Sequence, residues 1–260
     1  MQNPRLKVLG IIPARLGSTR IPEKMLADIS GKPLIQHTID RTKKAHLLDA
    51  LVVATDSERI ANIVKPLGVP VIMTPSELPT GSDRAGAATK LFTEFTPDVI
   101  AIIWGDEPLY PAEAIDQCVA LLQEDPELQV SIAADKIHDE EMWRSPSVVK
   151  VLTDLKNNVL SFSRAPVPFA HSTNSPVDLY HVIGVMVVRR EFLYEFLQMS
   201  RTPLELREGV EQMRILENGV RIRVVKGDWK NLGVNMPDEL EQVRTIMVAR
   251  QQKGDHDAWK

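Results

Sequence analysis

Residues 10–24, GIIPARLGSTRIPEK, join an apolar segment to a loop that is rich in cations. Arg15, Arg20 and Lys24 lie on this loop together with Ser18, directly after the apolar residues. In open α/β sheets, ligands bind at the carboxyl ends of the strands. A cationic loop at such an end suits a polyanion, most simply a nucleoside triphosphate. A solvated loop whose cations pair with acids elsewhere is an equally weighted alternative.

Outward from this loop, short apolar runs alternate with helical patterns through the first half of the chain. The apolar runs predict strands at residues 7–13, 50–55, 69–73, 99–104 and 130–134. The segments between them predict helices at residues 33–45, 57–67, 83–95 and 112–123. Such alternation is typical of βαβ units and a mostly parallel sheet, so we expect an α/β fold.

The pattern changes from about Trp143. Residues 147–153 and 159–163 predict a hairpin that turns at residues 156–158. Further strands are expected at 180–189 and 220–225, helices at 191–199, 203–217 and 237–250, and a mobile polar loop at 170–178. We therefore expect one domain over residues 1–250, with an inserted β-rich region at about 143–225, and a polar tail over 251–260.

Composition and known motifs exclude several classes of protein. The basic loop matches neither the GxxxxGK[ST] nor the GxGxxG phosphate-binding pattern. A net charge of −4 offers no broadly basic surface for nucleic acid. Cys118 is the single cysteine, which excludes an internal disulfide and favours a reducing compartment. The start has no signal-peptide pattern, and no apolar run approaches the ~20 residues that cross a bilayer. We expect a cytoplasmic protein that binds neither nucleic acid nor membrane.

Two further turns carry polar groups at the ends of predicted elements. Asp106 lies just beyond the apolar run 99–104, after Gly105, and a carboxylate there can hold Mg²⁺ together with phosphate oxygens. A helix cap is an equally weighted explanation of this carboxylate. In the GSDR turn at residues 81–84, Ser82 and Arg84 could contact a base edge. An ordinary helix start, capped by Ser82 or Asp83, is the favoured alternative there.

The second half of the chain offers groups suited to an acidic polyol. Arg164 lies in SRAPVP, just after a predicted strand, where a guanidinium can bind a carboxylate with two hydrogen bonds. Glu208 and Gln212 are i,i+4 neighbours if residues 203–217 form one helix, and they would then share a face with Glu205. A solvated, charged helix is the commoner meaning of such a pattern.

Taken together and in this order, the segments resemble the 3-deoxy-manno-octulosonate (Kdo) cytidylyltransferases. The matching pieces, spread over residues 8–245, are IIPARLGSTRIPEKML, DISGKPLIQHTIDR, VVATDSERI, GSDR, GDEP, SFSRAPVP, TPLELREGVEQMRILENG and GVNMPDELEQV. The opening loop alone also suits other sugar cytidylyltransferases, whereas SRAPVP and the EQMR segment favour the Kdo type. The resemblance implies a three-layer, Rossmann-like nucleotidyltransferase fold, a homodimer, and a role in bacterial lipopolysaccharide or envelope-polysaccharide synthesis.

The resemblance also implies a reaction and a set of residues. CTP would activate an acidic 2-keto-3-deoxy sugar, giving a CMP-sugar and pyrophosphate, with Mg²⁺ or Mn²⁺ as cofactor. The implied catalytic groups are Arg15, Lys24 and Asp106. The implied nucleotide-binding residues are Ala14, Arg15, Ser18, Arg20, Lys24, Ser82 and Arg84. The implied sugar-binding residues are Arg164, His181, Glu208 and Gln212, and the implied metal ligands are Asp106 and Asn235.

The chain departs from the family pattern at three places. Trp104 stands where the family usually has glutamine before GDEP, and Asn235 where it has a second metal-binding aspartate. The segment HVIG at residues 181–184 has one residue more than expected between histidine and glycine, and the tyrosines that usually follow are missing. These departures leave two alternatives open, the same chemistry on another acidic sugar of the nonulosonate type, or a non-catalytic nucleotide- or sugar-binding relative. A UDP-sugar glycosyltransferase ranks last, because it usually needs an Asp-x-Asp pair.

Overall fold

The computed structural model describes residues 4–18, 20–171 and 177–252. Its strands are β1 Val8–Ala14, β2 Asp28–Ile29, β3 Lys32–Pro33, β4 Ala50–Thr55, β5 Val71–Met73, β6 Val99–Ile103, β7 Val130–Lys136, β8 Lys150–Thr153, β9 Val159–Ser163, β10 Tyr180–Arg189 and β11 Ile222–Gly227. Its α-helices are α1 Leu34–Thr42, α2 Glu58–Val64, α3 Gly81–Leu91, α4 Ala112–Glu124, α5 Glu140–Arg144, α6 Arg190–Gln198, α7 Pro203–Glu208, α8 Gln212–Glu217 and α9 Pro237–Gln252. Short 3₁₀ turns cover Lys24–Leu26 and Lys65–Leu67.

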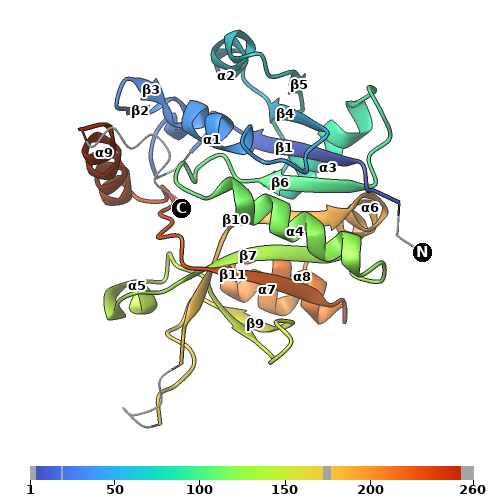
Figure 1. Cartoon of the computed structure of the whole chain (residues 1–260), viewed down its shortest axis with the longest axis vertical. Helices are drawn as coiled ribbons and strands as arrows, with labels where there is room; N and C mark the ends of the chain where they lie inside the picture. Colours follow the sequence, from blue (N-terminus) through green and yellow to red (C-terminus); the bar gives the residue numbers. More distant parts are fainter. Residues whose placement is uncertain (1–3, 19, 172–176, 253–260) are drawn as a thin grey trace.

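One large sheet runs through the described part of the chain, in the order β11-β7-β10-β6-β1-β4-β5 (Figure 1). The pairs β1–β4, β1–β6, β4–β5 and β11–β7 are parallel, whereas β10 is antiparallel to both β6 and β7. The strands β8 and β9 form the expected antiparallel hairpin, which joins the sheet through the start of β10. The predicted mostly parallel α/β sheet is therefore confirmed.

Helices cover both faces of this sheet, so the core has two halves. One half packs apolar residues of α1, α2, α4 and α9 against the sheet. The other half packs α3, α6, α8 and the β8–β9 hairpin against the opposite face. The strands β1 and β6 lie in the middle and are buried along their whole length, as apolar strands covered on both faces must be.

The direction of β10 decides where a ligand site can form. Residues Val185–Arg189 of β10 pair with β6 in reverse order, so the start of β10 lies at the carboxyl end of β6. The register with β7 shifts between Val182 and Met186, which marks a bulge. The carboxyl ends of β1 and β6 and the first half of β10 therefore meet at one edge of the sheet.

The predicted helix over residues 203–217 is wrong. Gly209 has a φ of 63°, which ends α7, and α8 begins at Gln212. Glycine adopts this left-handed conformation without the steric cost that a Cβ brings. The turn separates Glu208 from Gln212, so the two side chains do not share a helix face as expected.

Several smaller features of the chain also lie outside the predictions. The helix α5 and the short β2–β3 pair were not expected from the sequence. Part of the loop predicted to be mobile, residues 172–176, and most of the predicted tail, residues 253–260, lie outside the described residues. Within the described residues, the helices are too short or too polar for any of them to span a membrane.

Candidate active site

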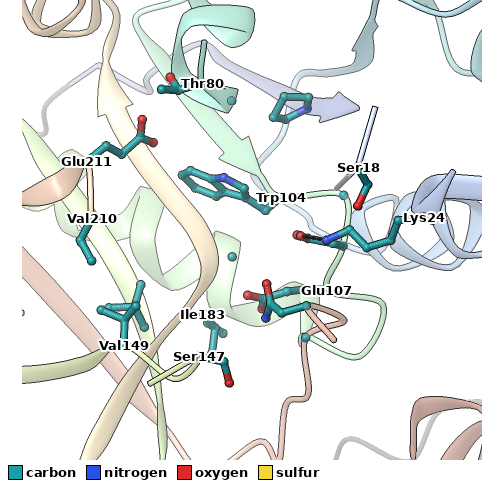
Figure 2. A pocket seen from close by; sticks show the side chains of 18 of the residues that line it. Ser18, Lys24, Thr80, Trp104, Glu107, Ser147, Val149, Ile183, Val210 and Glu211 are labelled. Atoms are coloured by element: carbon teal, nitrogen blue, oxygen red, sulfur yellow. Dashed lines mark hydrogen bonds and ion pairs between the residues drawn. The ribbon is translucent and has the colours of Figure 1, made fainter. Parts of the chain in front are cut away.

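A cleft of about 490 Å³ opens at the edge of the sheet where β1, β6 and β10 meet (Figure 2). Its lining comes from the basic loop after β1, the turn before α3, the turn after β6, the start of β10, and the segments before β8, α8 and α9. The cleft thus gathers residues from both halves of the chain. Its place at the carboxyl ends of parallel strands is where open α/β sheets bind their ligands.

The basic loop forms one wall of the cleft. Ala14, at the end of β1, lines it together with Arg15 and Ser18. Arg15 is exposed and Ser18 half-buried, so both side chains are accessible to a ligand. Arg20 is exposed and lies outside the lining residues. Lys24 also lines the cleft, and its Nζ donates to Asp106 Oδ2 at 2.5 Å and to the carbonyl of Val234 at 2.8 Å.

The turn after β6 places Asp106 directly opposite this loop. Thr38 Oγ1 donates to the carbonyl of Gly105 at 2.8 Å, and the Val234 amide donates to the carbonyl of Asp106 at 2.8 Å. These bonds fix the turn from both sides. A Cβ on Gly105 would lie 3.1 Å from Met25 Sδ, so a larger residue would require the Met25 side chain to shift. The Asp106 carboxylate is therefore held against Lys24.

Glu107 is a site residue that the sequence analysis did not single out. Its side chain lines the cleft (Figure 2), where a Cβ on Gly184 would lie 2.9 Å from the Glu107 Cδ. Asn231 Nδ2 donates to Glu107 Oε2 at 2.7 Å. Burial, with the nearby Asp106 charge adding to it, raises the pKa of Glu107 to about 7. A carboxylate next to Asp106 in the sequence was the only available signal, and the same pair also suits a helix start.

Asn235 and Glu239 belong to the segment where α9 begins. Both residues line the cleft, and Glu239 Oε2 accepts hydrogen bonds from the amides of Asn235 at 2.5 Å and Met236 at 2.9 Å. Glu239 is thus the residue that caps the start of α9.

The oxygen donors of the cleft fit a metal ion that arrives with a ligand. The described residues contain no group of three or more His, Cys, Asp or Glu side chains arranged to hold a metal. Asp106 supplies one carboxylate and Asn235 one amide, and both line the same cleft. Mg²⁺ commonly binds one or two carboxylates together with substrate phosphates, so this sparse donor set fits it.

The GSDR turn does not present all of its residues to the cleft. Thr80 caps α3, accepting from the Asp83 amide at 3.1 Å in a capping box. Ser82 is fully buried, lies outside the cleft lining and donates to Glu211 Oε1 at 2.6 Å. Arg84 lines the cleft but is 2% exposed, and it pairs with Asp56 Oδ2 at 3.2 Å. Both of these predicted nucleotide-binding residues are thus bonded to other side chains.

Glu211 is a second site residue that sequence reasoning missed. Its carboxyl group lines the cleft beside Thr80 (Figure 2). Its Oε2 is buried and meets no hydrogen-bond partner among the described residues. Burial raises the pKa of Glu211, although the Ser82 hydrogen bond opposes the shift. An unpaired buried oxygen is costly, so this atom is suited to meet a ligand donor. Glu211 is part of the EQMR segment that the sequence analysis quoted. The expectation of one continuous helix over residues 203–217 favoured Glu208 as the site residue instead.

Trp104 forms the floor of the cleft, between Thr80 and Glu211 on one side and Lys24 and Glu107 on the other (Figure 2). Its amide donates to the carbonyl of Gly184 at 2.9 Å, which continues the pairing of β6 with β10. A Cβ on Gly81 would lie 3.2 Å from the indole Nε1, and a Cβ on Gly184 would lie 3.1 Å from the Trp104 Cβ. Gly81 therefore leaves space for the indole ring, and Gly184 leaves space for the Trp104 Cβ and the Glu107 carboxyl group.

The predicted sugar-binding residues divide into two groups. His181 and Gln212 line the cleft. His181 Nε2 is buried without a partner among the described residues, and burial lowers its pKa to about 4, so the ring is neutral at pH 7. Glu208 lies outside the lining and accepts from Ser163 Oγ at 3.0 Å and from the Arg164 amide at 2.8 Å. Its carboxylate anchors the end of β9.

Arg164 lines the cleft with its guanidinium held by backbone carbonyls. Its Nε donates to the carbonyl of Glu208 at 2.7 Å, Nη1 to that of Pro146 at 2.7 Å, and Nη2 to that of Gly209 at 3.4 Å. Burial and the nearby Arg20 cation lower its pKa, while Glu208 opposes the shift. A guanidinium has five N–H groups, so each terminal nitrogen keeps one donor beyond these bonds to described residues.

The fold and the cleft together define a nucleotidyltransferase. A family model described as cytidylyltransferase matches residues 9–222, so the chain belongs to the cytidylyltransferase family. The fold is shared with a 4-diphosphocytidyl-2C-methyl-D-erythritol synthase from Anaerococcus prevotii, at 12% identity and a TM-score of 0.63, covering 94% of this chain and 100% of that one.

Two closer similarities place the chain within this family. It is 42% identical over 249 residues to a 3-deoxy-manno-octulosonate cytidylyltransferase from Geobacter sulfurreducens, covering 92% of this chain and 98% of the relative. A solved structure described as CMP:2-keto-3-deoxy-manno-octonic acid synthetase complexed with CTP superposes with a TM-score of 0.85 at 31% identity, covering 94% and 99% of the two chains. The chain is a member of the 3-deoxy-manno-octulosonate cytidylyltransferases, and the resemblance stated from the sequence is confirmed.

Proposed function

We propose that this protein transfers a cytidylyl group from CTP to 3-deoxy-manno-octulosonate or a closely related acidic 2-keto-3-deoxy sugar. The observation that carries the proposal is one cleft with two distinct cationic walls. Arg15 and Lys24 come from the loop after β1, and Arg164 comes from the end of β9. The first wall suits a triphosphate, and the second suits a separate carboxylate.

The reaction is an in-line displacement at the α-phosphorus of CTP. The anomeric hydroxyl oxygen of the sugar forms the new P–O bond and loses its proton to water. The bond from the α-phosphorus to the bridging oxygen breaks, and pyrophosphate leaves with that electron pair. Such chemistry depends mainly on positioning and on neutralising charge, which is the role we give to Arg15, Ser18, Arg20 and Lys24.

A divalent metal held by Asp106 and the Asn235 amide would neutralise phosphate charge and lower the pKa of the attacking hydroxyl. Without CTP and a metal ion, the Lys24 ammonium neutralises the Asp106 carboxylate at 2.5 Å. When they bind, the Lys24 ammonium would pair with a phosphate of CTP in place of Asp106. Glu107, buried beside them, supports the turn and keeps Asn231 in place.

Arg164 is the cation that lines the sugar side of the cleft, and Glu208 accepts a hydrogen bond from its backbone amide. The remaining donors on the two terminal nitrogens of Arg164 suit a carboxylate. We assign the hydroxyls of the sugar to the neutral His181, to Gln212 and to the unpaired oxygen of Glu211.

The test is pyrophosphate release from the purified protein with CTP, Mg²⁺ and a panel of acidic sugars. We expect release with 3-deoxy-manno-octulosonate and a large rise in the sugar KM in Arg164→Ala. Arg144→Ala is a matched control, because its exposed pair with Glu140 lies on α5, outside the cleft lining. CTP binding without turnover on any sugar would instead favour a non-catalytic relative, the alternative that Asn235 motivates.

Trp104 favours a second candidate, the same chemistry on a different acidic sugar of the nonulosonate type. The indole fills the floor of the cleft, where the family usually has an amide side chain that can both donate and accept. If Trp104 sets the sugar preference, Trp104→Gln should change which sugar acid is used while leaving the KM for CTP within about twofold. An unchanged ranking of sugars would exclude this role.

We also infer a homodimer that uses the inserted region, residues 143–225. This region carries most of the large apolar side chains that are exposed in the described chain, namely Leu155, Leu160, Phe169, Val177, Leu204 and Leu206. Exposed apolar side chains concentrated in one region of the sequence support an interface there. Light scattering on the purified protein should give twice the chain mass, and Leu160→Glu should shift it toward the monomer. A reducing cytoplasmic setting fits the single buried Cys118.

A further inference from the structure

Lys150 has an unusual place for a charged side chain. It begins β8 and is 1% exposed. Its ammonium donates to the carbonyls of Ser145, Val148 and Arg164, each at 2.8 Å. These bonds use all the donors of a lysine, and none of them goes to a carboxylate. Burial, with the Arg164 cation adding to it, lowers the pKa of Lys150.

The three carbonyls belong to the two segments that hold Arg164. One is the carbonyl of Arg164 itself, at the end of the hairpin. The other two flank Pro146, whose carbonyl accepts from Arg164 Nη1 at 2.7 Å. Lys150 therefore fixes both the backbone that carries the guanidinium and the turn that the guanidinium is bonded to.

The energetics indicate that this lysine has a role beyond filling space. Burying an ammonium is costly, and only good hydrogen bonds offset the cost. An apolar residue at this place would avoid the buried charge, but would remove the donor that the carbonyls of Val148 and Arg164 accept from. A buried carbonyl left unpaired costs about 1–3 kcal/mol, whereas the Ser145 carbonyl would keep the Val148 amide at 3.3 Å. The cleft is lined by the adjacent residues Ser147, Val148 and Val149. A change in the position of this segment would therefore change the contacts with a bound ligand.

We propose that Lys150 is a positioning residue for the acidic sugar, because it holds the Arg164 guanidinium with its remaining donors facing the cleft. The inference rests on the proposed function, in which Arg164 binds the sugar carboxylate. Lys150 itself does not line the cleft and touches neither substrate. Its loss should therefore weaken sugar binding and leave CTP binding intact.

The experiment is a double-mutant cycle of Lys150→Met and Arg164→Ala, with KM values measured separately for the sugar and for CTP. A misplacement of about 1 Å can cost on the order of 100-fold, so Lys150→Met should raise the sugar KM by about 10- to 100-fold. The KM for CTP should stay within about twofold. In the Arg164→Ala background, Lys150→Met should have little further effect on the sugar KM, because the group it positions is gone.

Lys226→Met is the matched control. Lys226, on β11, also contacts the β8–β9 hairpin through Thr153 Oγ1 at 2.7 Å, but none of its bonds reaches Arg164. It should leave the sugar KM unchanged. If Lys150→Met does not fold, Lys150→Gln replaces it, since the amide keeps two donors and should give a smaller rise in the sugar KM.

The outcomes separate this inference from the proposed function. Additive effects of Lys150→Met and Arg164→Ala, or equal rises in the KM values for CTP and sugar, would overturn the positioning role alone. A wild-type protein that releases no pyrophosphate with any acidic sugar would overturn the proposed function and, with it, the role of Lys150.

Discussion

The ammonium of Lys24 lies 2.5 Å from Asp106 Oδ2 and joins the basic loop after β1 to the turn after β6. Both side chains are largely shielded from solvent, with 12% and 23% of their surface exposed. The same ammonium donates to the carbonyl of Val234, at the segment that precedes α9. Three parts of the chain that are distant in sequence thus converge on one cation.

Lys24→Met should lower kcat/KM for pyrophosphate release by about 100-fold or more, as expected when a group that stabilises developing charge is removed. Lys32→Met is the control, because the Lys32–Asp40 pair is exposed and lies outside the cleft. Steady-state rates with saturating Mg²⁺ give the comparison. A loss of less than about threefold would show that Lys24 only neutralises Asp106.

Asn235→Asp should lower the Mg²⁺ concentration needed for half-maximal rate, because a carboxylate adds the charge that the amide lacks. Titration of the rate with Mg²⁺ at fixed CTP measures the change. Asn62→Asp, exposed on α2, adds the same charge elsewhere on the surface. An unchanged or greater metal requirement in Asn235→Asp would place Asn235 away from the metal.

His181 should make the protein sensitive to acid. Its pKa is lowered to about 4 in the folded state from 6.5, so the unfolded state binds more protons between these pH values. The stabilisation is present above about pH 6.5 and is lost as the pH falls toward 4, by at most about 3 kcal/mol. Urea unfolding at pH 7 and 4.5 should show a smaller acid loss in His181→Gln than in the wild type.

His46→Gln, on an exposed side chain, should show no such difference from the wild type. Proton NMR of the histidine rings measures the same shift directly. An ordinary pKa near 6.5 for His181 would contradict the prediction.

Gly209→Ala should lower the free energy of unfolding by about 1–2 kcal/mol, because its φ of 63° is unfavourable for any residue with a Cβ. The new methyl group has room, since only Arg164 Nε lies within 4.0 Å. Gly17→Ala, where φ is ordinary and nothing lies within 4 Å, should change stability by less than about 0.5 kcal/mol. Equal effects of the two substitutions would contradict the prediction, because they would show that the turn between α7 and α8 does not need a glycine at residue 209.

The sequence predicted the sheet well because its central strands are apolar on both faces and alternate with amphipathic helices. Val99–Ile103 is buried throughout, as its composition indicates. The basic loop and Asp106 were found for the same reason, since both follow such strands directly. The break at Gly209 was missed because a glycine within an otherwise helical pattern is often tolerated.

The partners of polar side chains could not be read from the sequence. Glu107 is bonded to Asn231, 124 residues away, and Ser82 to Glu211, 129 residues away. Ser82 and Glu208 were expected to bind ligands, but Ser82 is hydrogen-bonded to Glu211 and Glu208 to the Arg164 amide. Lys150 was unremarkable as a residue of a predicted hairpin, because its three acceptors are backbone carbonyls that no sequence pattern reveals.

The bulge in β10 has a consequence for how this family can diversify. Tyr180–Val182 and Met186–Val188 each keep their own register with β7, and the irregular stretch lies between them. A residue gained or lost in that stretch changes the side chains offered to the cleft, while the half of β10 that pairs with β6 stays in place. Without the bulge, a one-residue slip would turn every following side chain to the opposite face. New acceptor preferences can therefore evolve in β10 without disturbing the part of the sheet that supports the triphosphate loop.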